Sequence, residues 1–273
     1  MRHAAIVLGM HRSGTSAVAG AAIRLGFAPP RTPLAPTQDN PTGYHEPFAV
    51  VASNYRFLKS LGCTWYDCLS FDASLIDGAA RAAALNRCTA ILSQEFADEP
   101  AFVVKDPRLC LTLPIWIPAF RALASEVSVL LVVRHPDEVA KSVFRRDGLP
   151  QSDTAMVWLH HMLAAERTTR GMPRAVVLYD DLLNDWRGCM ARTGRLANIA
   201  WPIPAGHIQD DAVNLSLRHH VAASGYVSVG RPPLRDLIND AWLALRELAD
   251  DPGLHSVHER LDHVRSYFVA WRP

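Results

Sequence analysis

The chain has 273 residues, 49% of them hydrophobic, and its formal net charge is +1 at pH 7. This length is near the upper end of what one hydrophobic core serves, and no Ser/Gly-rich linker divides it, so we expect one domain over residues 1–273. The near-neutral charge argues against a nucleic-acid-binding protein with a broad basic face, because phosphate neutralisation needs clustered Lys and Arg.

The five cysteines show neither a CxxC pair nor zinc-type spacing, so we predict reduced thiols and no metal site. The N-terminus resembles a secretory signal only superficially, because His11 and Arg12 interrupt its apolar run too early. Nowhere else does the sequence contain the roughly 20 apolar residues that a transmembrane helix needs. These observations predict a cytoplasmic protein with no transmembrane segment.

Four short apolar runs alternate with helical patterns along the chain. They are Ala4–Leu8, Ala101–Val104, Val127–Val133 and Ala175–Leu178. Unbroken runs of this kind are typical of parallel strands that helices cover on both faces, and parallel strands need crossover connections long enough to hold a helix. The predicted fold class is therefore α/β, a three-layer P-loop-type fold with a central, mainly parallel sheet.

Helix signals fill the intervals between these runs. The first helix is expected from Gly14 to Gly26, and a proline-rich stretch after it predicts an ordered surface loop that precedes a helix over Pro47–Leu61. Near the end, apolar residues at helical spacing over 234–248 and 254–271 predict a C-terminal helical pair. This pair either covers the core with its apolar stripes or forms the surface of a homodimer.

The sequence GMHRSGTS at residues 9–16 directly follows the first predicted strand. Glycines let main-chain amides approach phosphate oxygens, and the N-terminus of the following helix adds partial positive charge, so an anion is held without metal. Thr15 occupies the position where nucleotide triphosphatases have lysine, and Arg12 supplies the cation instead. We therefore expect a phosphate ester other than a triphosphate. The candidate ligand-binding residues are His11, Arg12, Ser13, Gly14, Thr15 and Ser16.

A second polar group follows the most hydrophobic predicted strand. Arg134 stands at the end of that strand, and Pro136 begins a helix that carries Ser142 about two turns along. A guanidinium and a hydroxyl suit a second phosphate. The alternative is that Arg134 is an ion-pair partner of a nearby carboxylate, either Asp137, Glu138 or Asp106.

These motifs, together with Lys105-Asp106-Pro107-Arg108, resemble the PAPS-dependent sulfotransferase family over most of the chain, where PAPS is 3′-phosphoadenosine 5′-phosphosulfate. Bacterial members, and in motif style the tyrosylprotein and carbohydrate sulfotransferases, look most similar. The resemblance implies that residues 9–16 hold the 5′-phosphosulfate and that Arg134 and Ser142 hold the 3′-phosphate. The Arg-Lys-Gly loop of vertebrate cytosolic members is missing, and Arg218 or Arg231 are candidate substitutes.

The resemblance also implies a mechanism. Residues 39–46 are similar to a segment of bacterial sulfotransferases, which makes Glu46 the favoured general base, and Arg12 and Lys105 would stabilise charge on the transferring group and the leaving oxygen. Rival bases remain open, as does a plain helix-dipole role for Glu46 and a structural ion pair for Lys105 with Asp106. The rivals are His45, Asp106, His160 and His161. No metal is implied, and the nucleotide product is 3′-phosphoadenosine 5′-phosphate.

The acceptor is expected to be a hydroxyl of a carbohydrate or another small molecule, with Trp65-Tyr66 in a loop that lines its entrance. Four other tryptophans lie on apolar helical patterns and are predicted to be core residues. They are Trp116, Trp158, Trp242 and Trp271. Two alternatives to a sulfotransferase stay open: a small-molecule kinase with an atypical phosphate loop, and a non-catalytic nucleotide-binding scaffold that uses the C-terminal helices.

Overall fold

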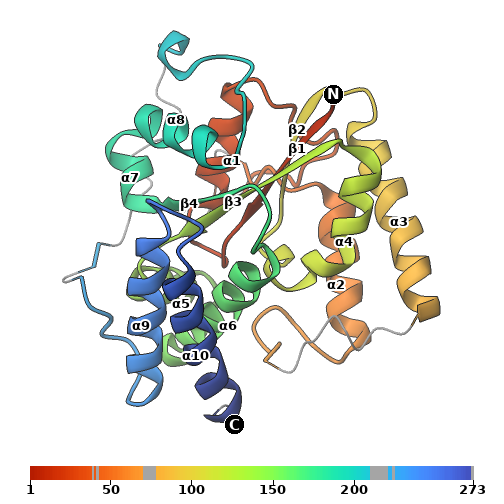
Figure 1. Ribbon diagram of the computed structural model, residues 1–273. Coiled ribbons are helices and arrows are strands. Elements are labelled where there is room, and N and C mark those ends of the chain that lie inside the picture. Colours follow the sequence, from red (N-terminus) through yellow and green to blue (C-terminus); the bar gives the residue numbers. More distant parts are fainter. Residues whose placement is uncertain (39, 41–42, 70–77, 210–220, 223–224, 272–273) are drawn as a thin grey trace.

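A parallel sheet of four strands forms the centre of the molecule (Figure 1). The structure is a computed structural model that describes residues 1–38, 40, 43–69, 78–209, 221–222 and 225–271. The strands are β1 (His3–Leu8), β2 (Ala101–Lys105), β3 (Glu126–Val133) and β4 (Arg174–Leu178). All four predicted strands are present, each one residue longer than the apolar run because flanking polar residues join the ladder.

The strand order is β2-β1-β3-β4, with every neighbouring pair parallel. Because β1 lies between β2 and β3, the chain leaves β1 toward one neighbour and later passes β1 to reach the other. The ends of parallel strands meet at one edge of the sheet, and ligands of open α/β folds bind where the order reverses. The segments after β1, β2 and β3 therefore converge at the position expected for a ligand.

Helices cover both faces of this sheet. They are α1 (Thr15–Arg24), α2 (Phe48–Ser60), α3 (Gly78–Phe96), α4 (Leu109–Leu123), α5 (Pro136–Asp147), α6 (Gln151–Thr168), α7 (Tyr179–Asn184), α8 (Trp186–Leu196), α9 (Leu234–Glu247) and α10 (His255–Trp271), with a short 3-10 helix η2 (Ala205–His207). Alternate residues of β1 belong to two separate cores: Ala5 and Val7 pack with α1, α7 and α8, whereas Ile6 and Leu8 pack with the other helices. The three-layer α/β prediction is confirmed.

Turn residues delimit the helices that carry the site. Gly14, in the left-handed region at φ 92°, precedes α1, and the chain turns again at Gly26 with φ 98°. Pro136 is the first residue of α5, where its missing N–H costs nothing, and Gly148 with φ 72° follows the helix. The expected starts of these helices are therefore observed.

The C-terminal pair α9 and α10 packs on the core. Ile238 and Trp242 of α9 and Leu261 and Phe268 of α10 are buried in the larger hydrophobic cluster, which confirms the core-covering alternative. The prediction that Trp271 is a core residue is wrong: it is 41% exposed, because it is the last residue of α10 and the contact with the core ends near Phe268. A homodimer through these helices stays a prediction.

All five cysteines are buried and unpaired by disulfides, and burial raises the pKa of Cys88 and Cys110 to about 12 and that of Cys189 to about 11. None of the described helices combines the length and apolar character needed to cross a bilayer. Arg218, one proposed substitute for the missing basic loop, lies outside the described residues, as do residues 39, 41 and 42 of the segment before Glu46.

Candidate active site

The loop after β1 is shaped by two glycines. A Cβ atom on Gly9 would lie 2.8 Å from the carbonyl oxygen of Val132 in β3, so only glycine lets the loop pass this strand. A Cβ atom on Gly14 would lie 2.2 Å from the ring of Tyr179, in addition to the strain of its positive φ. The N–H of Gly9 donates to Cys110 Sγ at 3.2 Å, which fixes the start of the loop against α4.

Arg12 links the first loop to the segment after β3. Its Nε donates to Ser142 Oγ at 2.8 Å, and Arg134 Nη1 donates to the Arg12 carbonyl oxygen at 3.1 Å. Arg12 adopts φ 69°, a left-handed conformation that costs a non-glycine residue about 1–2 kcal/mol and that is concentrated at functional sites. Residues that the sequence assigned to two separate phosphate sites therefore lie in contact.

Arg134 is oriented by two neighbours. Its Nε donates to Glu138 Oε2 at 2.8 Å, and its guanidinium lies 4.6 Å from the ring centroid of Tyr179. Arg134 and Glu138 are both almost fully buried. The ion pair considered for Arg134 therefore exists with Glu138 rather than with Asp137 or Asp106, and it coexists with the contact to Arg12.

Lys105 and Glu46 form a buried ion pair. Lys105, the last residue of β2, places Nζ 2.5 Å from Glu46 Oε1 and 3.2 Å from Ser16 Oγ. The hydroxyl of Ser16 also accepts a hydrogen bond from Asn40 Nδ2 at 3.2 Å, so the segment before α2 is held against the first loop. Burial raises the pKa of Glu46 above 4.5, although the Lys105 charge opposes this shift. Lys105 is paired with Glu46 and not with Asp106.

Arg108 is a component of the site to which the sequence analysis gave no role. It pairs with Asp106 at 2.7 Å, lies 3.8 Å from Glu46, and donates to the Tyr55 hydroxyl at 2.8 Å while stacking on that ring. Asn54 Nδ2 donates to the second Asp106 oxygen at 2.7 Å. The sequence feature that could have predicted this network is Asn54, a polar residue on the apolar stripe of α2.

This network removes Asp106 from the candidate bases, because both of its oxygens already accept strong hydrogen bonds from Arg108 and Asn54. Asn54 Oδ1 in turn accepts from Thr112 Oγ1 at 2.8 Å and from Trp116 Nε1 at 2.7 Å. The carboxylate of Asp106 thus has a structural role: it holds Arg108 beside Glu46.

The rival histidines have environments unlike that of Glu46. His161 is fully buried in α6, its Nδ1 contacts the Val157 carbonyl oxygen at 2.9 Å, and burial lowers its pKa to about 4. His160 packs against Phe268. Burial and the Lys105 charge lower the pKa of His45. Of the three rival histidines, His45 is the one whose pKa is lowered by the Lys105 charge.

Trp65 differs from its predicted role, because it packs against the buried His11. Trp65 is 8% exposed and its ring centroid lies 4.3 Å from that of His11, so Trp65 packs under the loop, while Tyr66, 46% exposed, faces outward. Burial, reinforced by the charge of Arg108, lowers the pKa of His11 well below 6.5. A neutral His11 therefore contributes packing and no net charge to the loop.

The residues around the loop fit a phosphate ester. Ser13 Oγ is buried without a hydrogen-bond partner, Gly9 and Gly14 leave the two ends of the loop without side chains, and the N-terminus of α1 faces the loop. Within the described ranges, no three His, Cys, Asp or Glu side chains are arranged to hold a metal ion. The polar groups at this place are backbone amides, hydroxyls and cationic side chains.

No protein-family model matches this sequence, and a search of curated proteins finds no match. Among solved structures, the chain is similar to the sulfotransferase domain from the curacin biosynthetic pathway, with a TM-score of 0.46 and 14% identity over 98% of this chain and 97% of that chain. It is also similar to the sulfotransferase domain from the Synechococcus PCC 7002 olefin synthase, with a TM-score of 0.44 and 15% identity over 97% and 95%. Both similarities are too weak to assign a function to this chain.

Proposed function

We propose that this protein is a sulfotransferase that uses PAPS to sulfate a hydroxyl of a carbohydrate or another small molecule. The observation that carries the proposal is the contact of Arg12 with both Ser142 and Arg134, beside the buried pair of Lys105 and Glu46. Two anion-binding groups and a carboxylate base are the parts that such a transfer requires.

The binding residues divide between two ends of a nucleotide. The amides and hydroxyls of residues 9–16, with Arg12, would hold the 5′-phosphosulfate, since this loop has an unpaired buried hydroxyl at Ser13. Arg134 and Ser142 would hold the 3′-phosphate, for which a guanidinium provides a planar pair of donors. When bound, PAPS supplies an activated sulfuryl group to the acceptor oxygen.

Glu46 would act as the general base. Its raised pKa keeps the carboxylate reactive toward a proton, because burial penalises the charged form more than Lys105 stabilises it. When Glu46 takes the acceptor proton, it no longer neutralises Lys105, whose ammonium group is held 3.2 Å from Ser16 in the phosphate-binding loop. The positive charge of Lys105 therefore becomes available to that loop at the moment when negative charge develops there.

Arg108 would set the geometry of the base. Its guanidinium lies 3.8 Å from Glu46 and is fixed by Asp106 and Tyr55, so the carboxylate of Glu46 is flanked by two cations. A base restrained on both sides keeps a constant direction toward the acceptor. The exposed ring of Tyr66 is a candidate contact for the body of the acceptor.

Isothermal titration with 3′-phosphoadenosine 5′-phosphate tests the proposal. We expect the wild type to bind this nucleotide, and we expect Arg134→Ala to weaken binding by at least about tenfold, the effect of losing one charge-assisted contact. Arg195→Ala is the matched control, because Arg195 lies in α8 and contributes nothing to the site.

No binding by the wild type, or equal affinity of the wild type and Arg134→Ala, would contradict the proposal. Magnesium-dependent binding of ATP with phosphate transfer would favour a kinase instead. Nucleotide binding without turnover on any of a broad panel of hydroxyl acceptors would favour a binding protein.

A further inference from the structure

Two adjacent carboxylates at the start of α5 hold a segment that lies far away in the sequence. The described residues 221–222 and 225–229 are called the strap. Asp137 accepts hydrogen bonds from the N–H of Ser228 at 3.0 Å and of Val229 at 3.0 Å, and from the Ser228 hydroxyl. Glu138 Oε1 accepts from the N–H of Ala222 at 3.0 Å. The first turn of α5 therefore fixes the strap at two points.

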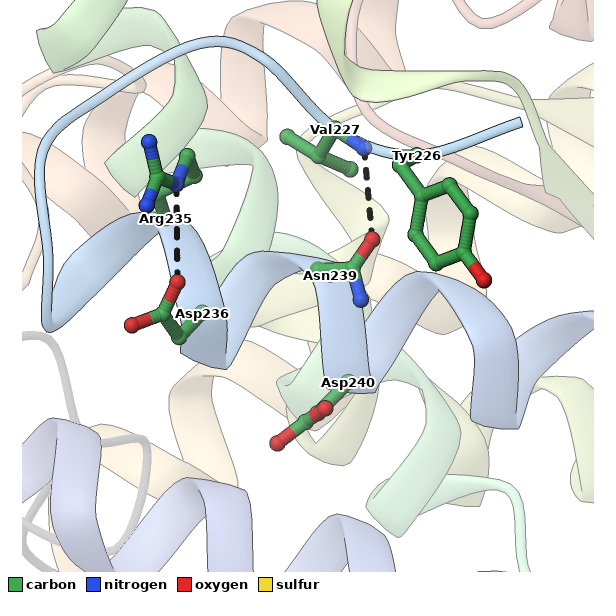
Figure 2. A pocket seen from close by; sticks show the side chains of 6 residues that line it. All are labelled: Tyr226, Val227, Arg235, Asp236, Asn239 and Asp240. Carbon is green, nitrogen blue, oxygen red and sulfur yellow. Dashed lines mark hydrogen bonds and ion pairs between the residues drawn. The ribbon is translucent and has the colours of Figure 1, made fainter. Parts of the chain in front are cut away.

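On its other side the strap meets α9 across a small cavity. The cavity has a volume of about 240 Å³, and its lining is shown in Figure 2. The N–H of Val227 donates to Asn239 Oδ1 at 3.2 Å, and Trp242 Nε1 donates to the Gly225 carbonyl oxygen at 3.0 Å. The strap is therefore held both by hydrogen bonds and by packing, because Val227 and Val229 are buried in the larger hydrophobic cluster.

Glu138 connects this strap to Arg134. One oxygen of its carboxylate accepts from Arg134 Nε at 2.8 Å, and the other accepts from the N–H of Ala222. The side chain of Glu138 is 2% exposed and that of Arg134 is 8% exposed, so the contact between them is shielded from water, while the contact with Ala222 is partly buried. One carboxylate therefore contacts both the guanidinium of Arg134 and the backbone of Ala222.

We propose that Glu138 is a positioning residue that fixes the guanidinium of Arg134 and couples anion binding at Arg134 to the position of the strap. The coupling to a nucleotide rests on the proposed function, whereas the contact of Glu138 with both partners does not. Asp137 anchors the strap without contacting Arg134 and acts as a fixed reference. Coupling of this kind is reciprocal: an anion that orders Arg134 also orders the strap, and an ordered strap strengthens anion binding.

Glu138→Gln removes one of the two acceptor oxygens that contact Arg134 and Ala222, and it leaves the volume of the side chain nearly unchanged. The carboxylate offers two acceptor oxygens to two N–H donors, whereas a glutamine amide offers one oxygen and presents an NH₂ group to the other donor. In the free protein we expect hydrogen exchange at Ala222 to accelerate by at least about tenfold, while exchange at Ser228 and Val229 stays unchanged.

Arg134→Lys provides a second variant of the free protein. Lysine keeps the charge but lacks the Nε–H donor, so Glu138 loses its fixed partner, and exchange at Ala222 is expected to accelerate in the same direction. Glu247→Gln, an exposed change on α9, is the matched control and should leave exchange throughout the strap unchanged. Unchanged exchange at Ala222 in both Glu138→Gln and Arg134→Lys would overturn the proposal.

The nucleotide experiment tests the coupling itself. In the wild type, 3′-phosphoadenosine 5′-phosphate should slow exchange at Ala222 more than adenosine 5′-monophosphate, which lacks the 3′-phosphate. In Glu138→Gln this difference should disappear. Equal protection by the two nucleotides in the wild type, when both bind, would overturn the coupling. If neither nucleotide binds the wild type, the proposed function fails, and the exchange of the free variants still decides whether Glu138 holds the strap.

Discussion

Replacing the buried His161 should flatten the dependence of stability on pH. Burial lowers the pKa of this imidazole from 6.5 to about 4, so the folded protein takes up the proton less readily than the unfolded chain. His161 therefore does not lower the free energy of unfolding above pH 6.5. As the pH falls from 6.5 to about 4, the free energy of unfolding decreases progressively. Over this pH interval the wild type should lose more stability than His161→Leu, because the variant has no imidazole at this position.

The size of the effect follows from the two pKa values. At pH 5 most unfolded chains carry the proton on His161 and most folded chains do not, which amounts to about 2 kcal/mol. Below pH 4 the difference reaches a plateau of about 3 kcal/mol. His11, whose pKa is also lowered, adds a loss of the same sign in both proteins, and the charge of His161 contributes little to that shift at pH 5, where most folded chains have a neutral His161.

The assay is urea unfolding of the wild type and His161→Leu at pH 7 and pH 5. The wild type should lose about 2 kcal/mol more than the variant between these pH values, whatever the stabilities at pH 7. His255→Gln is the matched control, because His255 is exposed, and it should follow the wild type. Equal losses in the wild type and His161→Leu would refute the assignment of a neutral, buried imidazole.

Three further outcomes are expected. Glu46→Gln should lower turnover about 10²–10⁴-fold, and the wild-type rate should fall on acidification at a pH above 4.5, as a steady-state pH profile will report. Gly14→Ala, which meets the Tyr179 ring, should reduce the free energy of unfolding by more than about 1 kcal/mol in urea, and wild-type stability would contradict this. Trp158→Ala should cost about 3–5 kcal/mol in the same assay, whereas Trp271→Ala should cost under about 1 kcal/mol.

The sheet was predictable because its signal is local. Each strand is a mainly apolar run bounded by polar or turn residues, with Ser128 the polar residue inside β3, and burial on both faces favours such runs. The helix starts at Gly14 and Pro136 were predictable for the same reason, since a positive φ and a missing N–H restrict those positions to few residues.

The contacts within the candidate site depend on parts of the chain that the sequence does not place relative to one another. Arg12 and Ser142 are 130 positions apart, and their contact follows from the pairing of β1 with β3. Arg108 belongs to a motif in the sequence, but its position depends on Tyr55, which it contacts, and on Asn54, which contacts its partner Asp106. Both residues lie on α2, which packs on α4. Patterns along the chain identify such residues and do not specify their partners.

Trp65 shows the corresponding error for an apolar residue. Its position in a loop predicted an exposed ring, but the loop folds back so that the ring packs on His11. Loops place side chains according to tertiary contacts rather than periodicity, and for this reason Tyr66 is the ring that faces outward.

The five buried thiols give this protein a chemical reporter of its own opening. Alkylating reagents react with the thiolate, and a pKa of about 12 at Cys88 and Cys110 leaves the thiolate over a thousandfold scarcer than in an unfolded chain with a pKa of about 8.5. Cys110 Sγ also accepts a hydrogen bond from the amide of Gly9, so its alkylation requires the loop at residues 9–16 to move away from α4. The rate of alkylation at Cys110 would therefore report how often the loop opens. A ligand that stabilises the closed loop would lower this rate.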